Sequence, residues 1–447
     1  MAMLLLMKAL PLAGFVFWLI SFPMNGFLMP DAWGNLLFYF TLSSALSYFL
    51  IPWFLQEKSF DIVSGAGSVL VVLLTVVSPL LQVPGRILLP AMGIASVLVM
   101  FRAIAILRSS SAPVVSAGLA IALGNILVFA LSYVHLPDIF KFFIIAASLF
   151  PAIFMKAEYS QESNLRELKK YLAFISIFYL IGGILYAYVR PEYEEVAMFK
   201  GFELLSYVFS ALAGIYLVKR WIDITLALGI ILGTLSFSFL LVGVPLLTVL
   251  GMFSIQAAFA LIDLYMVFLL VACGGSARVT GIGFGTVCLA ITAGEAVSKH
   301  LGAAAMPVIA AGNFILVTSV VIFYFTVMRK RDFSSESRTI TEGVFSGCQG
   351  NGISRSQLEA ILEDLYEPFQ KNLSEKEKSV LLMIVREKTY REAATELGIS
   401  ESTVKTHMKR ICGKMGVSGK DELMRKLSMS GSQGSRLRPG RQEFLKI

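Results

Sequence analysis

The chain has 447 residues, of which 56% are hydrophobic and only 15% are charged, and its mean hydropathy is +0.75. Soluble proteins carry roughly 45–50% apolar and about 25% charged residues, and disordered chains are more polar still. The composition therefore excludes both classes and indicates a membrane protein. Charge is uneven, however: residues 1–331 hold 19 lysines and arginines and 14 acidic residues, whereas the much shorter segment 332–447 holds 19 and 16. The sequence thus predicts a membrane body followed by a water-soluble C-terminal part.

Twelve hydrophobic segments in residues 1–331 reach or approach the length of about 18 residues that a helix needs to cross a bilayer. The expected spans are 9–28, 33–55, 62–83, 87–107, 113–134, 139–155, 171–189, 199–218, 222–243, 245–271, 279–301 and 305–328. The sixth is short and the eleventh is rich in glycine, so they carry the weakest signals. These segments predict an all-α, polytopic transmembrane bundle over residues 1–331.

The distribution of basic residues predicts how the bundle is oriented. With the N-terminus in the cytoplasm, fourteen lysines and arginines flank the spans on the cytoplasmic side and five on the other side. This is the sense that the positive-inside rule requires. An even number of spans then places the C-terminal part in the cytoplasm as well. We therefore expect a multi-pass protein of the cell (inner) membrane, surrounded by lipid and with both termini cytoplasmic.

The longest hydrophilic segment between spans, residues 156–170, divides the twelve spans into six and six. This layout resembles that of the major facilitator transporters, which implies a transporter-like bundle. The basic motif of that family between the second and third spans is missing, because residues 56–61 read QEKSFD. The resemblance therefore extends to the layout and not to a transport motif.

Three charged residues inside the expected spans are candidates for binding a ligand or signal. Charges are costly in a bilayer and mark a polar cavity, an ion pair or a snorkelling side chain. Asp263 lies deep in its span, whereas Glu295 is four residues from Lys299 and can be neutralised by it. Arg102 lies five residues from a cytoplasmic end and can snorkel. A structural role remains the alternative for each of Asp263, Glu295 and Arg102.

Metal, cofactor and catalytic sites are not expected. Cys273, Cys288, Cys348 and Cys412 form no Cys-x-x-Cys pair, and the three histidines do not stand at zinc-ligand spacing from them. The chain also has no phosphate-binding glycine loop and no nucleophile elbow. The sequence accordingly predicts no enzyme.

The sequence after the last span contains segments of different composition and expected structure. Residues 332–353 are rich in Ser, Thr and Gly and are expected to form a flexible linker. Residues 354–372 are expected to form an amphipathic helix, which either packs on the following domain or serves in dimerisation or signal transmission. Its apolar residues recur at helical spacing: Leu358, Ile361, Leu362, Leu365 and Phe369. At the end of the chain, residues 429–447 are expected to be a disordered basic tail.

Residues 373–428 predict a small domain of four helices. Ser374 and Glu377 form a capping box that opens the first helix, which ends near residue 386. The second helix is expected from about 390 to 397 and is ended by Gly398. The third runs from 401 to about 415, and the fourth from about 420 to 427. Val404, Met408, Ile411 and Met415 form the buried stripe of the third helix, which leaves a basic outer face.

Two short helices joined by a tight glycine turn, the second with a basic exposed face, are typical of a helix-turn-helix that enters the major groove. The alternative is a helical interaction domain with a solvated basic face. Residues 373–381 read LSEKEKSVL, and 399–407 read ISESTVKTH. These segments are similar to the opening and the recognition-helix signature of the LuxR-type DNA-binding domain. Lys376, Ser379 and Ala393 depart from the usual Arg, Glu and Ile.

The resemblance covers about 55 residues and implies a function. The expected DNA-contacting positions are Thr403, Lys405, Thr406, Lys409 and Arg410. Leu423 and Leu427 correspond to the dimer contact, so the expected partner is double-stranded operator DNA bound by a homodimer. The chain is then similar to membrane-embedded LuxR-type regulators, and a small-molecule inducer acting on the bundle is expected. The alternatives are a transporter with an appended regulatory DNA-binding domain, and a membrane scaffold whose tail binds protein.

Overall fold

The computed structural model describes residues 2–24, 26–30, 33, 36–55, 57–80, 84–159, 163–199, 201–301, 305–328, 374–385 and 389–415. These residues are almost entirely helical and contain no strand, which confirms the all-α fold class. The chain divides into two compact units, Met1–Gly350 and Asn351–Ile447. The expected linker, the connecting helix, the fourth helix of the small domain with Leu423 and Leu427, and the basic tail all lie outside the described residues.

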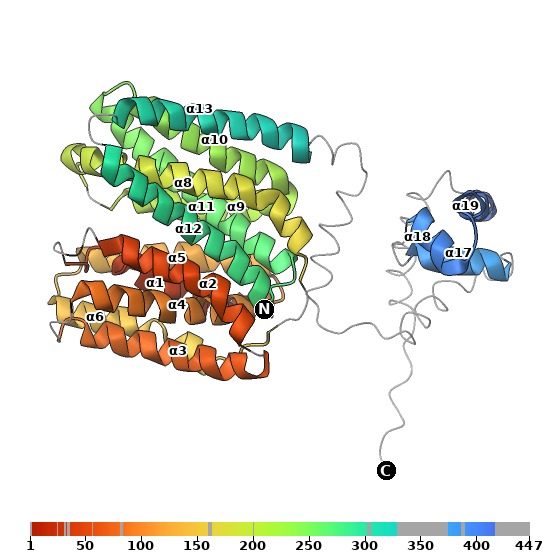
Figure 1. Ribbon diagram of the computed structural model, residues 1–447, viewed down its shortest axis with the longest axis horizontal. Coiled ribbons are helices and arrows are strands. Elements are labelled where there is room, and N and C mark those ends of the chain that lie inside the picture. Colours follow the sequence, from red (N-terminus) through yellow and green to blue (C-terminus); the bar gives the residue numbers. More distant parts are fainter. Residues whose placement is uncertain are drawn as a thin grey trace, which may run out of the picture. The chain divides into compact units, whose positions relative to one another are not determined.

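The first unit is a bundle of long helices in two sets (Figure 1). The first set is α1 (Ala2–Ser21), α2 (Leu37–Phe54), α3 (Glu57–Val77), α4 (Gly85–Arg108), α5 (Pro113–Tyr133), α6 (Asp138–Ala147) and α7 (Phe150–Phe154). The second set is α8 (Leu165–Val196), α9 (Glu203–Arg220), α10 (Ile222–Leu240), α11 (Pro245–Ala272), α12 (Ala277–Leu301) and α13 (Ala305–Phe323), which a short π-helix (Tyr324–Met328) extends. The division falls in the hydrophilic segment 156–170, where the sequence places it.

The two sets meet where α2 packs on α12 and α5 packs on α9. Glycines of α12 allow its close crossings with α2 of the first set and with α8 of its own set. A Cβ atom at Gly281 would lie 2.4 Å from the Tyr48 carbonyl oxygen of α2, and one at Gly294 would lie 2.5 Å from the Leu180 carbonyl oxygen of α8. Small residues let helix backbones approach in a membrane, where packing supplies the attraction between helices. The glycine content that weakens the span signal of α12 therefore serves helix contact.

Ten helical segments of the described residues are long and apolar enough to cross a membrane, and the other two predicted spans correspond to α6 with α7 and to α9. The predicted sixth span is broken into α6 and α7, of ten and five residues, because Pro151 lacks the N–H that would continue the helix. The predicted eighth span, α9, is continuous but carries Glu203, Lys219 and Arg220. The first helix also lies earlier than expected, at Ala2–Ser21 instead of 9–28.

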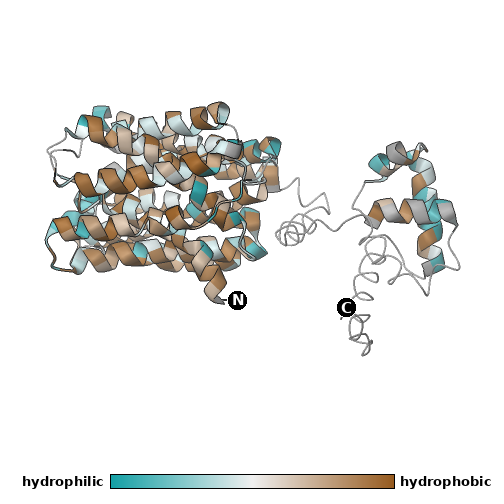
Figure 2. Ribbon diagram, turned by 90° about the horizontal axis from the view of Figure 1, so that it is seen from below, coloured by the Kyte–Doolittle hydropathy of each residue, from teal (hydrophilic) through white to brown (hydrophobic). Residues whose placement is uncertain are grey.

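Apolar side chains cover the outside of the bundle as well as its interior. Figure 2 shows hydrophobic residues along its flanks and hydrophilic residues mostly towards its two ends. Large side chains that are at least two-thirds exposed include Trp53, Phe54, Phe154, Phe209 and Phe314. A soluble protein rarely exposes continuous apolar surface of this kind, whereas a bilayer solvates it. The bundle is therefore that of a multi-pass membrane protein.

The second unit contains three described helices: α17 (Glu375–Val385), α18 (Tyr390–Leu397) and α19 (Glu401–Met415). Their bounds agree with the three helices predicted from the sequence. One apolar core joins them, with Val380, Leu381, Met383, Ile384, Ala393, Ala394, Val404, Met408, Ile411 and Cys412 buried. The predicted buried stripe of the third helix is thus confirmed at Val404, Met408 and Ile411.

Candidate functional sites

Side-chain caps fix the helices of the second unit. Ser374 and Glu377 form the predicted capping box, in which the Ser374 N–H donates to Glu377 Oε2 at 2.8 Å. A second box, which the sequence analysis missed, joins Thr389 and Glu392 at the start of α18. The Thr-x-x-Glu pattern there is the signal that would have revealed it. The two boxes satisfy N–H groups that would otherwise be unpaired at these helix starts.

The turn between α18 and α19 is built around Gly398. Its φ of +64° lies in the left-handed region, and the Ile399 N–H donates to the Ala394 carbonyl at 3.0 Å, which closes the end of α18. Ser400 then begins α19, because its hydroxyl accepts from the Thr403 N–H at 3.1 Å. The turn is therefore short and fixed at both ends, which sets the direction of α19 relative to α18.

A buried ion pair ties α19 to α17. Lys414 Nζ donates to Glu377 Oε2 at 2.7 Å, and the Glu377 side chain is almost fully buried while Lys414 is partly exposed. The bond from Lys414, with those from Ser374, lowers the pKa of Glu377 to about 2. The sequence analysis assigned Glu377 to the capping box but did not connect it with Lys414, which lies 37 residues away.

The exposed face of α19 carries the expected DNA-contacting residues. Lys405, Thr406, Lys409 and Arg410 are all exposed, and Thr403 is half-buried in the first turn. Lys405 forms an ion pair with Glu401, at 2.7 Å and one helical turn away. That interaction raises the pKa of Lys405 and lowers the pKa of Glu401, so both are charged at neutral pH. The arrangement presents a basic helix face that can meet phosphates and the acceptor atoms of guanine.

Within the bundle, Asp263 of α11 lies at the junction of three helices. Its two carboxylate oxygens accept hydrogen bonds from the hydroxyls of Tyr179 on α8 and Tyr207 on α9. The sequence identified Asp263 as a candidate, but not its two tyrosines, because they are 84 and 56 residues distant. The carboxylate is thus held in the interior by neutral donors.

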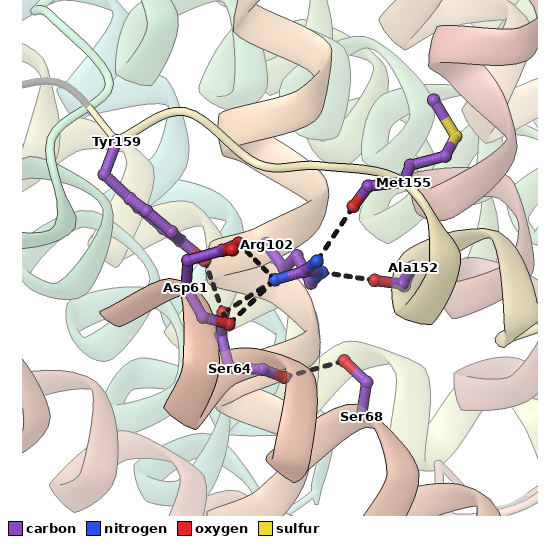
Figure 3. A network of polar contacts seen from close by, with 7 residues as sticks. All are labelled: Asp61, Ser64, Ser68, Arg102, Ala152, Met155 and Tyr159. Atoms are coloured by element: carbon purple, nitrogen blue, oxygen red, sulfur yellow. Dashed lines mark hydrogen bonds and ion pairs between the residues drawn. The ribbon is translucent and has the colours of Figure 1, made fainter. Parts of the chain in front are cut away.

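Arg102 of α4 is buried and is bound only to protein groups in the part of the chain that the structure describes (Figure 3). Its guanidinium forms an ion pair with Asp61 of α3 at 2.5 Å and donates to the Met155 carbonyl at 2.9 Å and to the Ala152 carbonyl. The expected snorkelling is not observed, because these partners satisfy the guanidinium inside the bundle. The geometry favours a structural role, in which Arg102 joins α3 and α4 to the end of α7.

Glu295 of α12 forms an ion pair with Lys299 at 2.7 Å, one turn further along the helix. The Glu295 side chain is mostly buried, and its second carboxylate oxygen is buried with no hydrogen-bond partner among the described residues. The three charged candidates are therefore distributed over separate helices and do not form one site. Nor do three His, Cys, Asp or Glu side chains come together as a metal site would require, within the described residues.

Comparisons with known proteins match the two units of the chain separately. Residues 371–427 match the family described as bacterial regulatory proteins, luxR family. The spore germination protein GerE of Bacillus subtilis (strain 168) is 37% identical over 59 residues, which are 13% of this chain and 80% of GerE. The match contains both capping boxes, the glycine turn and the basic helix face.

The bundle has a counterpart among solved structures, the crystal structure of the human organic anion transporter MFSD10 (TETRAN). The two chains superpose with a TM-score of 0.53 over 72% of this chain and 98% of the transporter, at 14% sequence identity. At that identity the likeness concerns the fold alone, and it fits the two sets of helices described above. The chain therefore belongs to the luxR family of bacterial regulatory proteins, and its LuxR-type DNA-binding domain is joined to a transmembrane bundle that resembles a major facilitator transporter.

Proposed function

We propose that the protein is a membrane-bound one-component transcriptional regulator, in which a signal sensed by the bundle controls operator binding by the C-terminal domain. The observation that carries the proposal is the basic exposed face of α19 in a LuxR-type domain, whose family binds DNA, on the same chain as a membrane bundle. A ligand can shift the domain only by binding two conformations of the bundle with different affinities.

DNA recognition is assigned to Lys405, Thr406 and Lys409 in the major groove, with Arg410 beside them and Thr403 at a phosphate. A single small module contacts too few base pairs for high specificity, so two copies are expected to bind a two-fold operator through Leu423 and Leu427. The fourteen-to-five distribution of basic residues supports a cytoplasmic location for both termini in the cell membrane. In that orientation the domain can reach chromosomal DNA.

The decisive experiment compares transcripts in cells with the wild-type gene and with Lys405→Ala plus Lys409→Ala. The double substitution should abolish the response without lowering the amount of protein in the membrane, because both side chains are exposed. Lys376→Ala plus Arg391→Ala is the matched control, since it removes two exposed basic side chains from α17 and α18. An unchanged transcript profile in the α19 variant would refute DNA reading by this face.

The transporter-like fold supports a second candidate function, transport by the bundle with regulation by the appended domain. Substrate flux into vesicles that contain residues 1–331 alone separates the two functions. Flux without the C-terminal domain favours transport, whereas ligand binding without flux favours a sensor.

A further inference from the structure

Two side chains of the otherwise buried part of α11 keep partial exposure. From residue 255 to residue 271 every residue of this helix is buried except Phe259 and Asp263, which are half-buried. They are four residues apart and therefore lie on one face. A charged group deep in a membrane bundle is expensive and is usually kept for a function. Asp263 is thus the strongest candidate for ligand contact in the bundle.

No cation neutralises Asp263 among the residues that the structure describes. Its bonds come from the hydroxyls of Tyr179 and Tyr207, which are neutral donors and supply no positive charge. The charged candidates Arg102 and Glu295 are already paired with Asp61 and Lys299. An uncompensated carboxylate in an apolar interior selects a positively charged ligand, because ion pairing offsets the cost of its burial.

Aromatic rings surround the face that carries Phe259 and Asp263. The ring of Phe259 lies 5.4 Å from that of Phe178, 6.0 Å from that of Tyr179 and 6.3 Å from that of Tyr186, measured between centroids. Aromatic faces attract organic cations and do so more strongly when water is excluded. The combination of one carboxylate with several rings favours an organic ammonium over a hydrated metal ion, which would require more oxygen ligands.

A row of tyrosines leads from Asp263 to one end of α8. Tyr179, Tyr186 and Tyr193 recur every seven residues, a rise of about 10 Å per step. The first and last of them have polar partners: Asp263 for Tyr179, and Glu203 for Tyr193 at 2.9 Å. The row therefore connects the interior carboxylate with the end of the bundle at which α8 gives way to α9.

That end of the bundle is acidic. From residue 190 to residue 203 the sequence contains four glutamates and two basic residues, and one of the glutamates, Glu203, binds Tyr193 in the row. Clustered charge of one sign raises the local concentration of ligands of the opposite sign. In the proposed orientation this end faces away from the cytoplasm, so a cation would arrive from outside the cell.

We propose that Asp263 anchors an interior binding site for a small organic cation, held by the carboxylate and by the rings of Phe259, Tyr179 and Tyr207. This inference rests on the proposed sensing function and names the class of its ligand. Without a cation the two tyrosine hydroxyls tie α8 and α9 to α11. A cation that takes the carboxylate competes with these bonds and loosens the ties, which gives the two bundle conformations different affinities for it.

The test uses the purified full-length chain in detergent and two probes of the same shape and opposite charge, tetraphenylphosphonium and tetraphenylborate. Wild-type protein should bind the cation at least about tenfold more tightly than the anion. Asp263→Asn should lose this preference. Asp223→Asn is the matched control, because Asp223 also accepts from an α8 tyrosine, Tyr171 at 3.4 Å, but lies on α10. Equal binding of both probes by the wild type would overturn the proposal.

Tyr207→Phe keeps the proposal testable where Asp263→Asn fails to fold. It removes one of the two hydroxyls that compete for the carboxylate, so the cation should bind more tightly, by about threefold or more. Unchanged affinity would place the cation elsewhere and overturn the assignment. Binding is measured without DNA, so failure here leaves the transcriptional role intact. A loss of promoter response in the α19 variant alone would have no bearing on cation binding.

Discussion

The two units of this protein use charge in opposite places. In the bundle the lipid-facing surface is apolar, and the informative charges, Arg102 and Asp263, lie inside it. In the LuxR-type domain the core is apolar, and the informative charges, Lys405 and Lys409, lie on the surface. Candidate sites in the bundle are therefore recognised by what is buried, and those in the domain by what is exposed.

The difference has an energetic consequence. A charge removed from water depends on its partners, and loss of one partner leaves a penalty of several kcal/mol. A charge on the surface of the domain is solvated, and its neighbours contribute little to stability. Substitutions of buried, paired charges such as Arg102 should therefore act through folding, and substitutions of exposed charges through DNA affinity. The following experiments test whether this division holds.

The largest effect is expected for Arg102→Met. The substitution leaves the Asp61 carboxylate and the Ala152 and Met155 carbonyls without their donor, which should destabilise the bundle by about 3–5 kcal/mol. The measurements are thermal unfolding in detergent and the amount of protein in the membrane. Arg278→Met is the control, because Arg278 is exposed and stacks over Trp53 at 5.3 Å, so its loss should cost about 1 kcal/mol or less. Similar effects for the two variants would contradict a structural role for Arg102.

The Glu377–Lys414 pair is the exception inside the domain, since it is a mostly buried charge pair. The pKa of Glu377 is lowered from 4.5 to about 2, so its stabilising effect is complete above pH 4.5 and is lost as pH falls towards 2. Because Lys414 is partly exposed and screened by solvent, the contribution is about 1–2 kcal/mol.

The measurement is urea unfolding of residues 351–447 between pH 7 and pH 3. Wild type should lose stability over this range, and Lys414→Met should lose less, since it lacks the partner that lowers the pKa. Equal pH dependence of the two proteins would show that the pair does not account for the loss of stability in acid.

Alanine substitutions at two glycines of the domain should change its stability in opposite directions. Gly398→Ala places a side chain at a φ of +64°, which costs about 1–2 kcal/mol although no atom lies within 4 Å of the new Cβ. Gly413→Ala, in the exposed part of α19, also meets nothing within 4 Å and should stabilise by about 0.5–1 kcal/mol. Unfolding of the two variants under the same conditions gives the comparison. Equal effects on stability would show that the left-handed backbone conformation at Gly398 does not account for the cost of its substitution.

The sequence predicted the domain more completely than the bundle. Local signals fixed the domain: a capping box at Ser374, a glycine at 398 and an apolar stripe on α19 predicted three helices at their observed bounds. The exposed basic face followed from the same stripe, because the basic residues left outside it are exposed, whereas their contact with DNA stays a prediction. The contact from Lys414 to Glu377 could not be predicted, since it depends on how α17 and α19 cross.

In the bundle, hydrophobic length predicted where most helices lie but not what their polar residues contact. Arg102 and Asp263 stood out as charges, yet their partners lie on other helices and at distances in sequence of 41 to 84 residues. No sequence periodicity or motif predicts a contact between polar residues on different helices. The break at Pro151 shows the same limit, because prolines elsewhere in these helices, such as Pro90, are accommodated without a break.

The smallest effect is expected for Glu401→Gln, which alters only solvated charge at the start of α19. Glu401 pairs with Lys405, and its carboxylate would also repel phosphates next to the helix. Removing it should free Lys405 and strengthen binding to nonspecific DNA by about two- to threefold at low salt, an advantage that disappears as salt screens it. DNA titrations at several salt concentrations measure this. Weaker binding would mean that Glu401 holds Lys405 in its DNA-binding position, and an exposed charge of α19 would then have the structural role that buried, paired charges have in the bundle.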